Sequence, residues 1–439
     1  MVTRLVLRQV DEWLDDELPR LNQAILHGDT PPGTLAEQLR EVLLPRLPAI
    51  GRLSGAQTRQ LVVRLGFAGA SVARHYQEWT PGGKQSPERA FDDLLAGADG
   101  VPFRDYFAAL AEQTGTGHCG RDSYASLVRW NVGTLVVRRG DRELAVLPGA
   151  FDDGRIRSYT GTAGEERFFL LVKQGEAIEL AANEALDPLS RDAISPACPE
   201  ALCRVRLATE LLFALRQLFL DFAALPPEQG MPADHFLDVF RQFAVHWTTG
   251  DIPPSGALDP EALKRDFLLG IDIPGYEQHV RRLFPALLSA ERAQIDELMC
   301  QPTLPRRLLT TLGLGEEILS ETDAHRLVAG RPELLDWYRL LTAHARAAGA
   351  HLMLSKRYLF KPQRRREEAG LGDKPLVSNR AGTTGMNETY LERLTRARRN
   401  HLLAPLRAAI TGETTENVPV SEVRSQPAAA APVSVALVA

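Results

Sequence analysis

Histidine is the residue type that offers the clearest route to chemistry here, because ten histidines occur alongside four cysteines. No HExxH motif, CxxC pair or carboxylate-rich EF-type loop is present, which disfavours a metal site built from several protein ligands. A site that needs only one protein ligand remains open. Haem iron is such a case, because the porphyrin supplies four nitrogens itself.

The best candidate for a single ligand is His351, which follows the small residues at 347–350 in the segment ARAAGAHLMLSKRYLFKP. Small side chains allow a flat macrocycle to approach a helix backbone. Leu354 and Tyr358 fall on the helix face of His351, so the imidazole would emerge from an apolar stripe. A lone histidine on such a face is more often a core residue than a ligand. His344, seven residues earlier on the same face, is a rival that this pattern leaves open.

Arg241 is a second residue with a chemical role to offer, because it lies in an otherwise apolar segment next to Phe240 and Phe243. A buried guanidinium needs an anionic partner. It can grip the carboxylate of an amino acid through two parallel hydrogen bonds, or it can form an internal salt bridge. The sequence leaves both possibilities open.

The elements that position these residues are mostly helical, which predicts an all-α fold of two helical domains. A small helical domain is expected over residues 1–130, and residues 131–163 are expected to connect it through a short β-hairpin in GTLVVRRGDRELAVLPG. Helical periodicity returns over 164–410, with an exposed loop expected at 361–385. Residues 411–439 are rich in Ala, Pro, Ser and Val and are expected to form a disordered tail.

Within the larger domain, the periodicity predicts individual helices at 165–187, 199–225, 232–247, 258–270, 275–299, 317–360 and 386–410.

Composition excludes several classes of protein. The chain has 439 residues, 44% of them hydrophobic, and 51 basic against 56 acidic residues give a net charge of -5, which disfavours nucleic acid as a partner. Four cysteines are too few for a disulfide framework. No apolar run is long enough for a secretory signal or a membrane helix. We therefore expect a cytoplasmic protein with no membrane partner.

The segment AHLMLSKRYLFKP resembles the proximal-histidine helix of the indoleamine 2,3-dioxygenase family. Similar pieces follow the family's order from about Leu47 to Leu403, including PAIGRLSGAQTRQLVVRLGFAGASVARHY and DSYASLVRWN. The resemblance favours His351 over His344 and implies that His351 holds the iron of haem b. RDFLLGID resembles the helix whose aspartate supports the proximal histidine, which nominates Asp266.

The resemblance also implies the opposite side of the haem. EERFFLLVKQGEAIELAA places Phe168 and Phe169 beside the sixth coordination position. HFLDVFRQFAVHW places Phe236 at the family's substrate aromatic and Arg241 at its carboxylate-binding arginine. NRAGTTGMNETYLERL resembles the family's mobile Gly-Thr loop, which is expected to fold over the substrate with the residues Gly382, Thr383, Thr384 and Gly385.

Two features depart from the family. Val172 occupies the position of a small hydroxylic residue that is common on the distal helix, and the segment between Trp247 and Asp266 is much shorter than in the tryptophan-cleaving members. The run WN, with RSYTG further on, is similar to the aminopyrrolnitrin-forming branch of the superfamily. These departures leave the substrate open.

The resemblance implies a haem dioxygenase that inserts O2 into the indole ring of tryptophan or a related indoleamine, giving an N-formylkynurenine-type product. Its partners would be O2, the aromatic amino acid and an electron donor that keeps the iron ferrous. Two alternatives stay open: a natural-product pathway haem oxygenase acting on a modified aromatic amino acid, and a haem-binding protein without catalysis.

Overall fold

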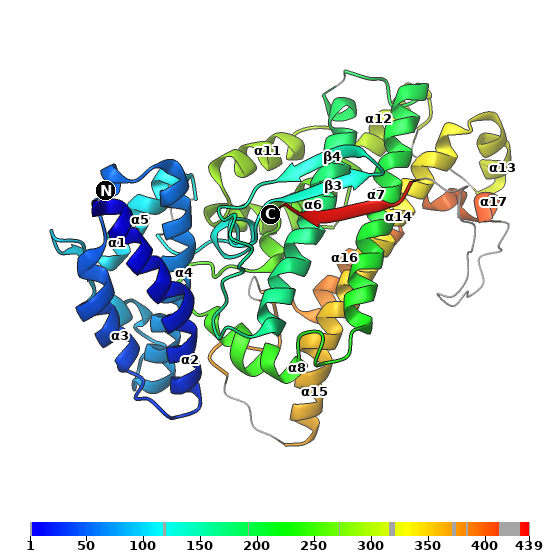
Figure 1. Cartoon of the computed structure of the whole chain (residues 1–439). Helices are drawn as coiled ribbons and strands as arrows, with labels where there is room; N and C mark the ends of the chain where they lie inside the picture. The colour runs from blue at the N-terminus through cyan, green and yellow to red at the C-terminus, as the bar shows by residue number, and fades with distance from the viewer. Residues whose placement is uncertain are drawn as a thin grey trace.

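The computed structural model describes residues 2–116, 120–191, 193–271, 273–315, 321–370, 375–382, 385–411 and 431–438. Helices dominate these residues, with small antiparallel sheets between them, which confirms the mostly helical class expected from the sequence. Figure 1 shows the N-terminal helices grouped on one side and the long helices of the C-terminal half on the other. No helix in the described ranges is long and apolar enough to cross a membrane.

The N-terminal group is built around one long helix, α4, which begins with a capping box between Ser54 and Gln57. Seventeen of the residues of α4 are buried, so this helix forms the centre of its group. The helices of the group are α1 (Val2–Glu12), α2 (Leu18–Leu26), α3 (Thr34–Gln38), α4 (Gly55–Trp79) and α5 (Phe103–Thr114). A two-residue strand pair, β1 (Leu95–Ala96) and β2 (Val101–Pro102), precedes α5.

The predicted hairpin is confirmed: β3 (Leu135–Arg139) pairs antiparallel with β4 (Arg142–Leu147). Its turn needs a residue in the left-handed region, which Gly140 supplies with φ 58°. A third strand, β5 (Val433–Leu437), pairs antiparallel with the other edge of β3. The expected disordered tail is therefore corrected for residues 433–437, whose alternating β-branched sequence VSVAL suits an edge strand.

The larger helical group is centred on three long helices, α6 (Ala163–Ser190), α7 (Pro199–Ala224) and α14 (Glu333–Ser355), which pack against one another. Around them lie α8 (Ala233–His235), α9 (Pro260–Leu269), α10 (Tyr276–Leu283), α11 (Ser289–Met299), α12 (Leu304–Thr311), α13 (Glu321–Gly330), α15 (Lys361–Glu368), α16 (Glu388–Arg399) and α17 (Arg407–Thr411).

Prolines explain most differences between the expected and observed helices. Pro285 divides the expected helix 275–299, and Pro332 separates α13 from α14 within the expected helix 317–360. The expected exposed loop at 361–385 begins instead with α15, because Pro362 lies in the first turn of a helix, where it is tolerated. The expected helix 232–247 ends at Phe243, and α12 was not predicted.

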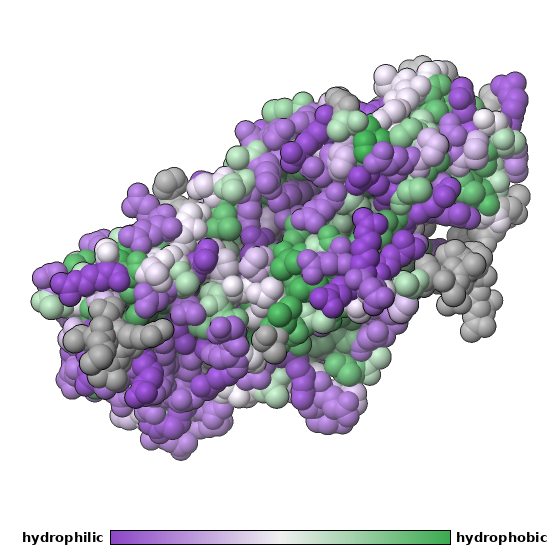
Figure 2. All heavy atoms as spheres, turned by 45° about the horizontal axis from the view of Figure 1, so that its top comes forward, coloured by the Kyte–Doolittle hydropathy of each residue, from purple (hydrophilic) through white to green (hydrophobic). Residues whose placement is uncertain are grey.

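The N-terminal helices do not have a core of their own. One hydrophobic cluster contains residues of α2 and α4 together with Phe169 of α6 and Phe243 and Trp247, which lie beyond α8. A second cluster joins α6, α7 and α14 with the sheet. Figure 2 shows hydrophilic residues over most of one face, with hydrophobic residues gathered mainly near its middle.

Candidate functional site

His351 lies near the end of α14, where its side chain is exposed although protein surrounds it. Burial among neighbouring atoms, and then the positive charges of Arg398 and Arg265, lower the pKa of His351 to about 4. The ring of Phe219 on α7 lies 5.7 Å from the imidazole, measured between centroids. The side chain is thus reachable from solvent, while neighbouring protein atoms disfavour its charged form. The imidazole is therefore neutral at pH 7 and keeps a nitrogen lone pair.

Asp266 does not contact His351. Its carboxylate accepts hydrogen bonds from His344 Nε2 at 3.1 Å, Arg398 Nη2 at 2.6 Å and the Tyr276 hydroxyl at 2.6 Å. Burial opposes its ionisation, but Arg398 and His344 hold the pKa of Asp266 well below its usual range. The structure thus corrects the expectation that Asp266 supports His351, because its oxygen atoms are committed to three other partners.

The same contacts separate the two candidate histidines. His344 is 2% exposed, and its Nε2 atom is hydrogen-bonded to Asp266. Burial lowers the pKa of His344 to about 4, so it is a neutral core histidine. His351 makes no side-chain hydrogen bond within the part of the chain that the structure describes. Of the two imidazoles, the solvent-exposed one is His351.

Aromatic side chains from three elements meet in the hydrophobic cluster that also contains Leu354, three residues after His351. We call them the aromatic cluster: Phe168, Phe236, Phe240 and Tyr358. The ring of Phe168 lies 5.3 Å from the rings of both Phe236 and Phe240, and Phe236 lies 5.8 Å from Tyr358. The three phenylalanines are half-buried. Phe169 is 1% exposed and packs in the core. The cluster therefore offers apolar ring surface at a partly open site.

Phe219 links the aromatic side of the site to His351. Its ring packs against α6, because a Cβ added at Gly175 would lie 3.5 Å from Phe219 Cε1, an ordinary van der Waals distance. Val172 lies about one turn before Gly175 and is half-buried. Leu354, three residues after His351, packs in the same hydrophobic cluster as Phe168 and Phe236. These contacts bring the sequence-predicted residues of α6 and α14 to one region of the fold.

Arg241 is a buried guanidinium without an ionic partner among the described residues. It is 7% exposed, and burial lowers its pKa to about 10. Its Nη2 atom donates to the carbonyl of Ser378 at 2.7 Å and to the carbonyl of Ala381, while its Nε atom has no hydrogen-bond partner. The internal salt bridge considered from the sequence is not what holds it. A buried cation with a free donor can bind a carboxylate.

The predicted Gly-Thr loop begins where Arg241 holds the chain. Ala381 forms an isolated antiparallel bridge with Asn387, and the N–H of Gly382 donates to the carbonyl of Met386 at 2.8 Å. Gly385 has φ 83°, a conformation that favours glycine. Thr383 and Thr384 lie outside the described residues. Arg241 thus connects the start of this loop to the π-helical turn Phe236–Phe240, which supplies two residues of the aromatic cluster.

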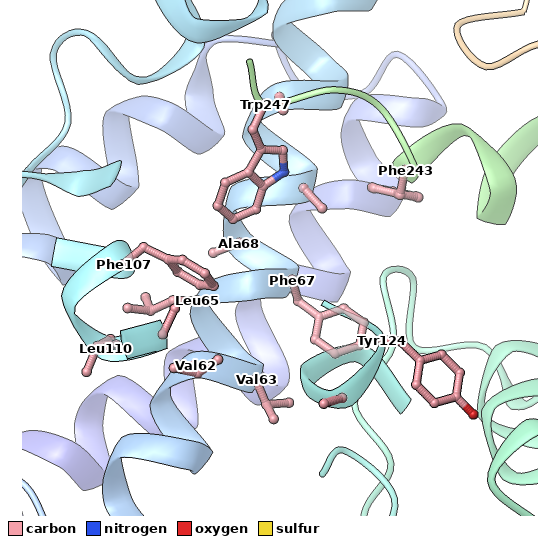
Figure 3. Packing of buried hydrophobic residues seen from close by; sticks show 14 of the residues in the cluster. Val62, Val63, Leu65, Phe67, Ala68, Phe107, Leu110, Tyr124, Phe243 and Trp247 are labelled. Carbon is pink, nitrogen blue, oxygen red and sulfur yellow. The ribbon is translucent and has the colours of Figure 1, made fainter. Parts of the chain in front are cut away.

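Packing against the N-terminal helices fixes the element that carries Arg241. Trp247, six residues after Arg241, is 1% exposed and packs against Gly69 of α4. A Cβ added at Gly69 would lie 2.3 Å from Cη2 of the Trp247 ring, so only glycine fits there without a shift. Figure 3 shows Trp247 and Phe243 pointing toward the residues of α4, with Phe107 beside Trp247. The N-terminal helices therefore help to set where Arg241 lies.

Two pairs of contacts at the site were not predicted. Arg398 is bound to Asp266, but in the run TRARR nothing distinguishes it from its neighbouring arginines. His235 Nε2 lies 2.9 Å from Glu165 Oε1. The sequence offered one signal for this second pair: His235 directly precedes Phe236, and Glu165 lies three residues before Phe168.

The residues around His351 match part of what a haem group requires. A haem needs one neutral imidazole as its ligand and apolar side chains around the ring. His351 provides the imidazole, and the aromatic cluster shares a hydrophobic cluster with Leu354 on the same helix. The small residues before His351 do not line an open space, because Ala347 packs in the core with α6 and α7 and a side chain at Gly349 would face Arg399. No group of three or more potential metal-binding side chains occurs among the described residues.

No protein-family profile matches this chain, and no curated protein matches it significantly.

Proposed function

We propose that this chain is a haem-dependent oxygenase that binds an indole amino acid such as tryptophan and adds both atoms of O2 to its ring. The observation that carries the proposal is Arg241, a buried guanidinium with an unbonded Nε donor and no described carboxylate partner, which directly follows Phe240 of the half-buried aromatic cluster in the chain. A cation next to apolar ring surface is complementary to an aromatic amino acid.

The chain's own residues would bind and orient the substrate. Arg241 would pair with the carboxylate, while Phe168 and Phe236 would hold the ring through edge and face contacts. His351 would hold the iron through its neutral imidazole. Ferrous haem, kept reduced by an electron donor, would supply the activation of O2. The N-formylkynurenine-type product contains both oxygen atoms, so no further oxidant is needed.

A second candidate has one observation in its favour. Val172 is half-buried on α6 and offers no hydroxyl group to the site, unlike the small hydroxylic residue expected from the resemblance. A natural-product pathway oxygenase that acts on a modified aromatic amino acid is consistent with this change. The mass of the product formed from tryptophan, O2 and a reductant distinguishes the two, because dioxygenation adds two oxygen atoms.

Haem retention tests the proposal at its base. Purified protein supplemented with haem should show a Soret band, and His351→Ala should lose it. His344→Ala is the matched control on the same helix face, and we expect it to keep the haem while lowering stability, because it leaves Asp266 with one partner fewer. Loss of haem from the His344 variant alone would reverse the assignment.

A further inference from the structure

A histidine–carboxylate pair lies next to the aromatic cluster. His235 Nε2 is 2.9 Å from Glu165 Oε1, and His235 is half-buried, whereas Glu165 is 0% exposed. Glu165 is fixed from the other side by Thr160, which donates from its backbone N–H at 3.0 Å and from its hydroxyl at 2.8 Å. A buried carboxylate with three donors is an oriented acceptor and not a free surface charge.

The two members of the pair lie on the elements that build the cluster. Glu165 precedes Phe168 and Phe169 by three and four residues on α6, which puts them on one helix face about one turn apart. His235 directly precedes Phe236 at the start of the π-helical turn that ends in Phe240. The pair and the cluster are therefore neighbours in space as well as in sequence.

The hydrogen bond to Glu165 determines which ring nitrogen of His235 carries the proton. An ionised carboxylate only accepts hydrogen bonds, so Nε2 of His235 carries the proton that Glu165 receives. In the neutral ring Nδ1 is then an acceptor, and no described residue hydrogen-bonds to it. The hydrogen bond to the carboxylate also holds the ring in one orientation, as it does in histidines that work in catalysis or on metals.

We propose that His235, oriented by Glu165, accepts a hydrogen bond from an N–H group of the bound amino acid and so selects ligands that carry this donor. The inference rests on the proposed function, because it takes Arg241 as the site of the ligand's carboxylate. His235 and Arg241 flank the segment of the chain that carries Phe236 and Phe240, whose rings lie 5.9 Å apart in the aromatic cluster. Two N–H sources exist in tryptophan: the ring nitrogen and the ammonium group.

Calorimetric titration tests this proposal without requiring turnover. Haem-supplemented wild-type protein, His235→Phe and His235→Gln are titrated with L-tryptophan, 1-methyl-L-tryptophan and indole-3-propionate. Phenylalanine keeps a ring but removes the acceptor, so the affinity for tryptophan should fall about tenfold. Glutamine can donate to Glu165 and still offer its oxygen atom, so it should bind within about threefold of wild type.

The two ligand analogues identify the source of the N–H. If the ring nitrogen is the donor, 1-methyl-L-tryptophan should bind wild type weakly, and His235→Phe should not change its affinity. If the ammonium group is the donor, indole-3-propionate should bind wild type weakly, and His235→Phe should not change its affinity. The matched control is His246→Phe, which removes an exposed histidine paired with Asp251 at 2.7 Å and should leave the affinity for tryptophan unchanged.

Equal affinity of wild type and His235→Phe for all three ligands overturns the role of His235 and leaves the proposed function standing. A wild-type protein that binds none of them overturns both. Thermal unfolding of His235→Phe and His235→Gln guards against a structural effect: His235→Phe leaves Glu165 with one donor fewer and should unfold at a somewhat lower temperature, so the titrations are carried out well below the midpoints of both variants.

Discussion

The proposed site depends on one neutral nitrogen and one buried positive charge, and each is produced by its surroundings. Desolvation keeps His351 unprotonated, which a metal ligand requires. The same effect at Arg241 lowers its pKa only to about 10, so the guanidinium remains charged at pH 7 and lacks a fixed counter-ion among the described residues. Burial therefore has different consequences for two bases of different strength.

The role of Arg241 can be tested by substitution. Arg241→Gln removes the charge but keeps a donor, and we expect the free energy of L-tryptophan binding to weaken by about 1.5–3 kcal/mol, the usual range for a hydrogen bond to a charged group. The affinity for indole, which lacks the carboxylate, should stay within about threefold of wild type. An equal loss for both ligands would mean that the substitution disturbs the loop carbonyls at 378 and 381 instead.

Residue types and spacing were enough to nominate Arg241 and His351, because an arginine in an apolar run and a histidine after small residues are unusual, whereas Phe236 was nominated by the resemblance to a known family. They were not enough to place Asp266, whose partners come from three other helices and are set by packing. A sequence pattern reports the face of a helix on which a side chain lies, but not which side chain from another element meets it there.

At the scale of elements, the site is assembled by helices that are fixed by specific close contacts. Trp247 fills the space left by Gly69 on α4, and Gln242 accepts from Val377 N at 2.9 Å, so the segment carrying Arg241 is held from two sides. Close packing of this kind is sensitive to a single added methyl group.

Gly69→Ala should lower the free energy of unfolding by about 1–3 kcal/mol, because the new Cβ would lie 2.3 Å from the Trp247 ring and the ring must move. The matched control is Gly55→Ala on the same helix, where an added Cβ meets nothing within 4 Å. Chemical denaturation of both variants measures the difference. A Gly69 variant as stable as the Gly55 variant would refute this packing.

Elements with a local cause were predictable from the sequence, and those with a distant cause were not. The hairpin around Gly140 has its turn and both strands within one short segment. The strand β5 forms only because β3, about 300 residues earlier in the sequence, presents a free edge, so its segment looked like an irregular tail. Pairing across such a distance leaves no periodic pattern at either end.

At the scale of the molecule, β5 closes the sheet against the larger helical group, since Val433 and Val435 pack on the core shared by α6, α7 and α14. A chain ending at Ala430 should therefore unfold at a lower temperature than the full chain and should aggregate more readily, because the edge of β3 becomes exposed. Unfolding at the same temperature as the full chain would contradict the pairing.

Buried histidines predict how stability depends on pH. The pKa of His75 is lowered to about 3 by burial and by Arg74, below the value of about 6.5 in an unfolded chain. As pH falls from 7 to 5, the unfolded chain takes up a proton that the folded protein excludes, so His75 should reduce stability by about 2 kcal/mol. At pH above 6.5 the histidine is neutral in both states and this effect is absent.

Denaturation of wild type and His75→Gln at pH 7 and pH 5 measures the contribution of His75. The loss of stability between the two pH values should be smaller in the variant by about that amount. An identical loss in both proteins would show that His75 takes up its proton without unfolding.

The central claim joins His351, Arg241 and the aromatic cluster in one haem and substrate site, and an absorption spectrum of the ferrous protein tests it most directly. The account predicts a Soret band in haem-supplemented wild type, a shift of that band on addition of L-tryptophan, and the same shift in Arg241→Gln only at concentrations of L-tryptophan at least about tenfold higher. A wild-type protein without a Soret band, or one whose band does not respond to L-tryptophan, would contradict it.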